Sequence, residues 1–82
     1  MKYTVVWRPT AEDELAEIWL HGLDRRAVTN AAHRVEIALR HSPEMKGQEF
    51  YGDRLLVDDP LAVIFSVDPG DRMVQILSVW HR

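Results

Sequence analysis

The sequence predicts an α+β fold, in which a helical hairpin packs on one face of a four-stranded, mainly antiparallel sheet. Residues 3–8 and the last third of the chain are rich in β-branched and aromatic runs that are typical of strands, whereas two segments between them follow the helical period. Turn-forming residues separate the strand-like runs. The chain has 82 residues, of which 46% are hydrophobic, so we expect one domain over residues 1–82 with one small core.

The first strand and the first helix are expected on either side of a proline. Residues 3–8 are rich in aromatic and β-branched side chains and stop at Pro9, which predicts a strand. Thr10 stands where an N-cap is expected, with Asp13 three residues later, so we predict a helix from Thr10 to near Gly22. Its apolar stripe contains Leu15, Ile18, Trp19 and Gly22.

A second helix is predicted after a very short turn. Asp24 is suited to cap its start, and Ser42-Pro43 ends it because the residue before a proline avoids the helical region. Its apolar stripe contains Val28, Ala31, Ala32, Val35 and Leu39. Two amphipathic helices joined this tightly predict an antiparallel hairpin. The polar stretch 44–52, with two glycines, is interpreted as a loop.

Three more strands complete the order β-α-α-β-β-β. They cover residues 54–57, residues 61–67 and the chain from Arg72 onward, with turns at 58–60 and 68–71. In the second turn, Pro69 and Gly70 occupy the positions that a type II turn favours.

The faces of this sheet follow from pairing Val57 with Leu61 and Val67 with Arg72. The covered face then carries Leu55, Leu61, Val63, Phe65, Val67, Val74, Ile76 and Trp80. The opposite face carries Arg54, Leu56, Ala62, Ile64, Ser66, Met73, Gln75, Leu77, Val79 and His81. Its apolar members Leu56, Ile64, Met73, Leu77 and Val79 predict a surface that a partner peptide or a second subunit covers. Arg54 falls level with Gln75, roughly 20 Å along a strand from His81, so no direct site between the two is expected.

Composition excludes several classes of function. The net charge of −3, without a run of like charges, is not typical of a dedicated nucleic-acid binder. The absence of cysteine rules out disulfides and thiolate metal sites. Glu17 and His21 form an i, i+4 pair, but the spacing places no further ligand beside them, so no metal or cofactor is expected. The apolar run at residues 3–7 is too short for a signal peptide or a membrane span, which predicts a cytoplasmic protein.

Several segments resemble the RelE/ParE superfamily of toxins from type II toxin–antitoxin (plasmid stabilisation) modules. They are "VVWRPTAEDELAEIWL" near the start, "GDRLLV", "AVIFSVDPGDRMVQILSV" and the terminal "HR". The resemblance covers almost the whole chain. It implies a toxin that is silenced by an antitoxin protein and that either cleaves messenger RNA in the ribosome or inhibits DNA gyrase.

The resemblance also implies candidate site residues for RNA cleavage. Arg54 stands where these nucleases place a basic residue near strand two, and His81 with Arg82 stands where a basic pair follows strand four. His81 would act as acid or base with Glu49 or Glu44 as its partner, while Arg54 and Arg82 would stabilise the phosphate. The usual strand-three arginine is replaced by Ala62, and the usual C-terminal tail is missing, which favours the gyrase-directed branch.

Three hypotheses for the function remain at this stage. The first is an endoribonuclease, ribosome-dependent or free, and the second is a binding module, either a gyrase inhibitor or a degenerate toxin that only pairs with a partner. The third is a homodimer formed through the open sheet face. The plainer interpretations are a solvated terminus for His81 and Arg82, and a surface ion pair of Arg54 with Asp53 or Asp58.

Overall fold

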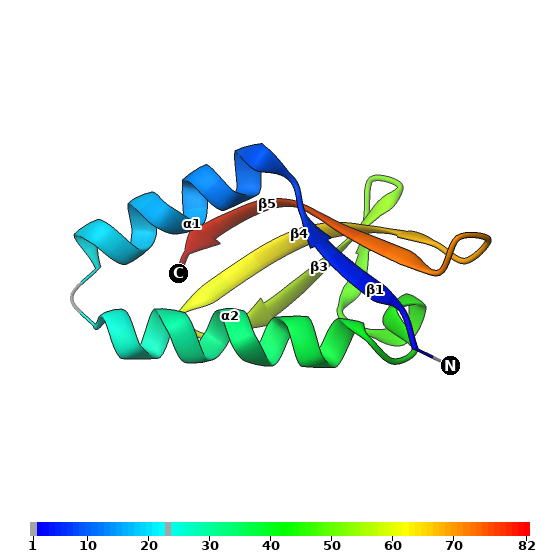
Figure 1. Cartoon of the computed structure of the whole chain (residues 1–82), viewed down its shortest axis with the longest axis horizontal. Coiled ribbons are helices and arrows are strands. Elements are labelled where there is room, and N and C mark those ends of the chain that lie inside the picture. Colours follow the sequence, from blue (N-terminus) through cyan, green and yellow to red (C-terminus); the bar gives the residue numbers. More distant parts are fainter. Residues whose placement is uncertain (1, 23) are drawn as a thin grey trace.

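Five strands form one sheet with two helices on the same face (Figure 1). The computed structural model describes residues 2–22 and 24–82. The elements are β1 (Thr4–Trp7), α1 (Pro9–His21), α2 (Arg25–Leu39), the 3₁₀ helix η1 (Pro43–Met45), β2 (Gln48–Phe50), β3 (Asp53–Asp58), β4 (Leu61–Asp68) and β5 (Met73–His81). The strand order is β1-β5-β4-β3-β2, and β1 alone runs parallel to its neighbour. The predicted α+β fold, a helical hairpin on a mainly antiparallel sheet, is confirmed with one strand more than expected.

Helix α1 begins one residue earlier than its predicted cap. Arg8 is the N-cap residue, with extended backbone angles and no capping side chain, and Pro9 occupies the first helical position. The prediction that Thr10 and Asp13 form a capping box is therefore wrong. Proline suits this position because its ring presets the helical φ and its missing N–H would have no intrahelical partner there.

Helix α2 follows its predicted pattern closely. Asp24 caps it by accepting a hydrogen bond from the Ala27 N–H at 3.0 Å. Four members of the predicted stripe are buried, and Ala32 packs partly against them. Of the predicted turn between the helices, Leu23 lies outside the described residues.

The stretch 44–52 was expected to be a loop, but part of it is strand β2. Phe50 pairs with Asp53, which closes a hairpin over Tyr51 and Gly52. These two residues have φ angles of 50° and 88°. Positive φ at both central positions is typical of the two-residue turns that match the twist of adjoining strands.

The β4–β5 hairpin keeps the predicted faces in its first half but not the predicted turn. Val67 pairs with Val74 rather than with Arg72, a shift of two residues that leaves the same side chains on the covered face. The positive φ of 51° belongs to Arg72, not to Gly70, so the type II turn prediction is wrong. The Asp71 N–H donates to the Asp68 side chain at 3.1 Å instead.

A bulge then exchanges the faces to which the side chains of the second half of β5 point. The register shifts between Ile64 and Phe65, and Leu77 is the extra residue. Val79 consequently turns into the core with 1% of its surface exposed, while Trp80 turns to the open face with 40% exposed. The predictions of Val79 and His81 on the open face and of Trp80 on the covered face are wrong for this reason.

Strand β3 is offset by one residue from its predicted register. Val57 pairs with Ala62, and Asp58 pairs with Leu61. Because strand side chains alternate, this offset moves Arg54 and Leu56 to the helix side and Leu55 and Val57 to the open side. Leu56 accordingly packs against the core, so its predicted place on the open face is wrong.

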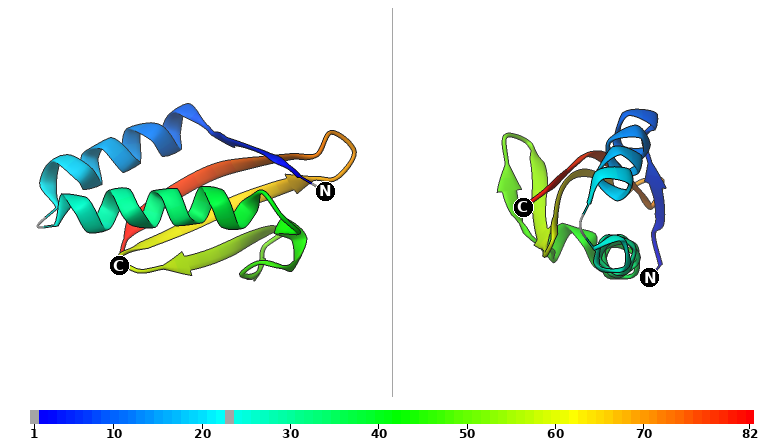
Figure 2. Two further views of the ribbon diagram at one scale, coloured as in Figure 1. Left: turned by 60° about the horizontal axis from the view of Figure 1, so that its bottom comes forward. Right: turned by 90° about the vertical axis from the view of Figure 1, so that its left-hand side faces the viewer.

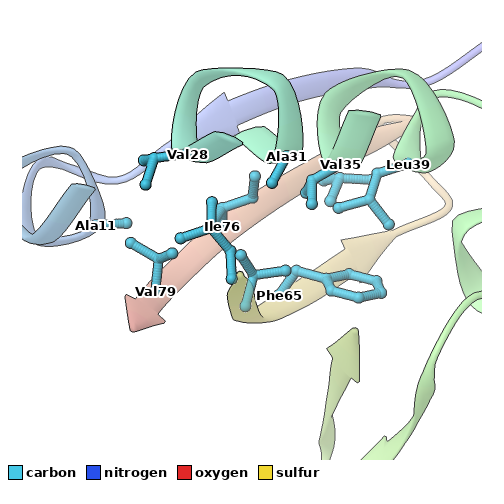
Figure 3. Packing of buried hydrophobic residues seen from close by; sticks show 11 residues of the cluster. Ala11, Val28, Ala31, Val35, Leu39, Phe65, Ile76 and Val79 are labelled. Carbon is cyan, nitrogen blue, oxygen red and sulfur yellow. The ribbon is translucent and has the colours of Figure 1, made fainter. Parts of the chain in front are cut away.

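The core lies between the helices and the covered face of the sheet (Figure 3). Its fully buried members are Ala11, Val28, Ala31, Val35, Leu39, Leu61, Val63, Phe65, Val74, Ile76 and Val79. Viewed along the molecule, the helices lie on one side of the sheet only (Figure 2). The opposite side is free of helices.

Candidate functional site

The face of the sheet that no helix covers is called the open face below. By the observed register, it carries Leu55, Val57, Ala62, Ile64, Ser66, Met73, Gln75, Ser78 and Trp80, with Leu77 in the bulge. Of the predicted partner-binding residues, Ile64 and Met73 lie on it, Leu77 lies at its bulge, and Leu56 and Val79 do not. Val57 and Trp80, which were not predicted there, are 44% and 40% exposed.

The open face offers little that would bind phosphate. By the register, the side chains that β3, β4 and β5 direct to it include no lysine or arginine. At its β1 edge, Arg8 donates through Nη1 to the side-chain oxygen of Gln75 at 3.0 Å. Ala62, where the resemblance implied that an arginine is usual, is 2% exposed. This face is suited to apolar contact rather than to a nucleic-acid backbone.

Arg54 and Glu49 meet at one end of the sheet. They are direct partners across β2 and β3, and both line a hollow of about 440 Å³ together with Gly52, Asp53, Phe65 and Val67. The Arg54 guanidinium donates through Nε to the Lys46 carbonyl at 2.8 Å and through Nη2 to the Gly47 carbonyl at 3.2 Å. Two of its donors therefore hold the backbone that leads into β2.

His81 and Arg82 lie at the other end of the molecule, beside the connection between the helices (Figure 1). His81 is the last residue of β5 and pairs with Leu61. The backbone N–H of Arg82 donates to the Pro60 carbonyl at 2.8 Å, and its Nη1 donates to the Asp59 carboxylate at 3.1 Å. These contacts attach the chain end to the β3–β4 turn.

The four candidate catalytic residues thus form two pairs rather than one site. Arg54 is level with Phe65 and His81 with Leu61 on β4. This separation corresponds to about 13 Å along the strand, on the usual rise per residue. Glu44, the other predicted partner of His81, lies in η1, which leads to the Arg54 end.

The carboxylate of Asp58 pairs with Arg34 rather than with Arg54. Arg34 donates to it through Nε at 3.0 Å and through Nη2 at 2.8 Å, and Nη2 also reaches the Asp59 carbonyl. The hydrogen bond with Asp58 raises the pKa of the Arg34 guanidinium. The β3–β4 turn is therefore held from one side by α2 and from the other by Arg82.

An apolar groove that was not predicted from the sequence lies between α1, α2 and β1. It has a volume of about 910 Å³, and its lining includes Trp7, Leu15, Trp19, Leu20, Val28 and Ala32. Trp19, a member of the predicted apolar stripe, is 40% exposed, and Leu20 is 53% exposed. The sequence signal that could have indicated this surface is Leu20, an apolar residue outside the predicted stripe of the first helix.

Residues 2–22 and 24–82 contain neither a metal-binding cluster nor a membrane-spanning helix. No group of three or more His, Asp or Glu side chains there is arranged to hold a metal ion. None of the helices in these ranges has the length and apolar composition needed to cross a membrane.

Comparison with known proteins places the fold. No family model and no curated protein matches the sequence. Among solved structures, a chain of the toxin–antitoxin complex RelBE2 from Mycobacterium tuberculosis has a TM-score of 0.79 and 22% identity, with 100% of this chain and 93% of that chain covered. A chain of the chromosomal ParDE TA system from P. aeruginosa has a TM-score of 0.76 and 20% identity over 98% and 96%.

A mutant of the E. coli toxin RelE, in the free state, has a TM-score of 0.70 and 15% identity, with 99% of this chain and 84% of that chain covered. Similarity at these identities speaks for fold and not for activity. The chain has the fold of RelE/ParE toxins over its whole length, as the resemblance implied.

Proposed function

We propose that this chain is the toxin component of a type II toxin–antitoxin pair and that an antitoxin protein neutralises it by covering the open face. The observation that carries the proposal is the apolar open face with exposed Val57 and Trp80 on a RelE/ParE toxin fold. Exposed apolar surface of this kind is typical of partner-binding sites. Ile64, Met73 and Leu77 supply the central contacts in this proposal, and the protein acts as one domain in the cytoplasm.

The proposed toxic action is binding to a protein target of the DNA gyrase type rather than cleavage of messenger RNA. Cleavage through the 2′-hydroxyl requires proton transfer and cationic stabilisation of the phosphate at one place. His81 and Arg54 lie at different ends of the sheet, and both arginines of the candidate set already hold backbone or turn atoms. A protein–protein inhibitor does not need such a site.

Induction in a bacterial host tests this proposal in two stages. Induction of the chain alone is expected to arrest growth, and co-expression of the small protein encoded beside it is expected to relieve the arrest and to co-purify with it. The purified chain is then added to a gyrase supercoiling assay and to a ribosome-dependent messenger RNA cleavage assay. Inhibition in the first assay without cleavage in the second supports the proposal, whereas cleavage without inhibition contradicts the proposed target.

RNA cleavage remains the second candidate because Glu49 and Arg54 share one hollow. In that case Glu49 takes the proton of the 2′-hydroxyl and Arg54 stabilises the phosphate, while His81 and Arg82 act on a different part of the RNA. Cleavage that is lost in Glu49→Gln but retained in Glu44→Gln would establish this site. Growth arrest that persists in His81→Ala would remove His81 from the mechanism.

Two further outcomes identify the remaining alternatives. A chain that neither arrests growth nor inhibits gyrase, yet co-purifies with its neighbour, is a degenerate toxin that serves as a binding module. A chain whose molar mass by light scattering is twice that of the monomer forms a homodimer. If the Trp80→Lys variant is a monomer in the same measurement, the homodimer uses the open face.

A further inference from the structure

One edge of β1 is unpaired and faces the groove between the helices. β1 ends the strand order and pairs with β5 alone among the described strands, while just before it the Tyr3 N–H donates to the Arg40 carbonyl at 2.7 Å. The Thr4 N–H donates to the Arg72 carbonyl, and the Arg8 N–H donates to the Ile76 carbonyl, both at 2.9 Å. In a parallel ladder alternate residues direct both of their backbone groups to the same neighbour. The N–H and C=O groups of Val5 and Trp7 therefore point away from β5, and both residues line the groove.

The walls of the groove are apolar and held in place. Trp19 of α1 donates through Nε1 to the Thr29 hydroxyl of α2 at 3.1 Å. The guanidinium carbon of Arg25 lies 4.7 Å from the centre of the same ring. A tryptophan fixed in this way and still 40% exposed can bury area against a ligand without losing much conformational entropy.

The ionisable side chains that line the groove are mainly acidic, whereas the cations of Arg25 and Arg40 lie beside its walls and outside the lining. Its lining holds the carboxylates of Glu12 and Glu36 and the imidazole of His33, and includes no lysine or arginine among the described residues. One oxygen of Glu36 accepts from Trp7 Nε1 at 2.7 Å, and the other lies 3.9 Å from Arg40. Glu12 has no ion-pair partner in the described part of the chain. A ligand that enters here gains from carrying a cation.

We propose that the groove binds an extended, basic segment of a partner protein, which adds to the free edge of β1 as a further strand. Backbone hydrogen bonds to Val5 and Trp7 supply affinity, since strand addition satisfies an unpaired edge. Alternate apolar side chains of the segment contact Trp19 and Leu20, and a lysine or arginine lies near Glu12. The inference rests on the proposed function only in assigning this segment to the antitoxin.

The direct test uses synthetic peptides and the ¹⁵N-labelled full chain. One capped peptide of about eight residues, a usual strand length, alternates valine and lysine, and its matched control replaces each lysine by glutamate. We expect the lysine peptide to shift the amide signals of Val5 and Trp7 and the indole signal of Trp19, and to slow exchange of the first two amides. The glutamate peptide should bind at least about tenfold more weakly.

Three substitutions locate the contact. Glu12→Lys should weaken binding of the lysine peptide by about tenfold, whereas Asp71→Lys, the same charge change on an exposed residue outside the groove, should not. Val5→Pro removes one outward N–H while leaving the bonds to β5, so it should also weaken binding by about tenfold. If Val5→Pro does not fold, Leu20→Ala replaces it as the test. Its position is exposed, so it should keep the fold, and it should weaken binding of the lysine peptide.

Several results would overturn the inference. They are equal affinity for both peptides, signal changes confined to the open face, a helical conformation of the bound peptide, and full affinity in Glu12→Lys. Different results would contradict the groove and the proposed function. An antitoxin that binds Glu12→Lys and Leu20→Ala as tightly as the unmodified chain overturns only the groove, whereas lysine-peptide binding at β1 in a chain that pairs with no protein overturns only the toxin assignment.

Discussion

Arg54 uses two guanidinium donors to hold the carbonyls of Lys46 and Gly47, just before β2 begins. Replacement by methionine keeps most of the aliphatic stem and removes both bonds. Because each such bond contributes about 1 kcal/mol, Arg54→Met should lower the free energy of unfolding by about 1–2 kcal/mol, measured by urea denaturation. Arg26→Met, at an exposed position on α2, is the control and should change it by less than about 0.5 kcal/mol. Equal effects would mean that Arg54 has no structural role.

At the scale of single residues, the sequence identified the right kinds of side chain but not their partners. Arg54 was predicted on the open face because Val57 was predicted to pair with Leu61. It lies on the helix side and finds backbone carbonyls, which a sequence does not display. Arg82 was predicted to stabilise a phosphate, yet it bonds Asp59 across the β3–β4 turn. Partners supplied by tertiary contact decide what a charged side chain does.

The β2–β3 hairpin depends on two glycines in different ways. Gly47, with φ +63°, has no room for a side chain because a Cβ there would overlap the Leu55 carbonyl, whereas Gly52, with φ +88°, has nothing within 4 Å. Gly52→Ala should cost about 1 kcal/mol, from backbone strain alone. Gly47→Ala should cost about 3 kcal/mol or more, since strand and preceding backbone must separate. Thermal and urea unfolding of the two variants compares them, and similar losses would contradict the close contact at Gly47.

The edge of β5 beyond its pairing with β1 is closed by a carboxylate. Glu14 of α1 accepts the Ser78 hydroxyl at 3.1 Å and the Val79 N–H at 3.2 Å through Oε1. Glu14→Ala should therefore speed amide exchange at Val79 and lower the free energy of unfolding by about 1–2 kcal/mol. Glu17→Ala, on the exposed side of the same helix, should leave the Val79 amide unchanged. Hydrogen exchange followed by NMR measures both, and unaltered exchange in Glu14→Ala would exclude this closing contact.

At the scale of elements, periodicity predicted α2, β4 and the first half of β5 well, since their burial follows their sequence pattern. It failed where geometry rests on a single residue. The Tyr51-Gly52 turn was not predicted because tyrosine is unusual at positive φ. The bulge at Leu77 was not predicted because no residue type in the sequence marks its position. One inserted residue then exchanged the faces of Val79 and Trp80. Of the predicted partner-binding residues, Ile64 and Met73 lie on the open face as predicted, because the register of this part of β4 and β5 keeps the predicted faces.

At the scale of the whole molecule, the open face and the helix-covered face differ in what they leave exposed. Trp80→Lys places a charge on the proposed antitoxin interface, which should cost at least about 2 kcal/mol of binding free energy. Ile37→Lys, on an exposed position of α2 outside the open face, is the matched control and should bind normally. Calorimetry with the co-purified partner measures the difference. Undiminished binding by Trp80→Lys would move the interface elsewhere.

The distribution of charge gives the last test, because it separates a protein-directed toxin from a ribonuclease without reference to any one residue. The net charge is −3, and the strands of the open face direct no lysine or arginine to it. Affinity for RNA comes mainly from counterions released by such cations, so single-stranded RNA should bind more weakly than about 10⁻⁴ M at physiological salt. The logarithm of the affinity should also fall with the logarithm of salt with a slope below about 2 in magnitude. Fluorescence anisotropy over a salt series measures both quantities. A steep slope with micromolar binding would mean that several cations converge on RNA, and the nuclease hypothesis would then replace the gyrase-type proposal.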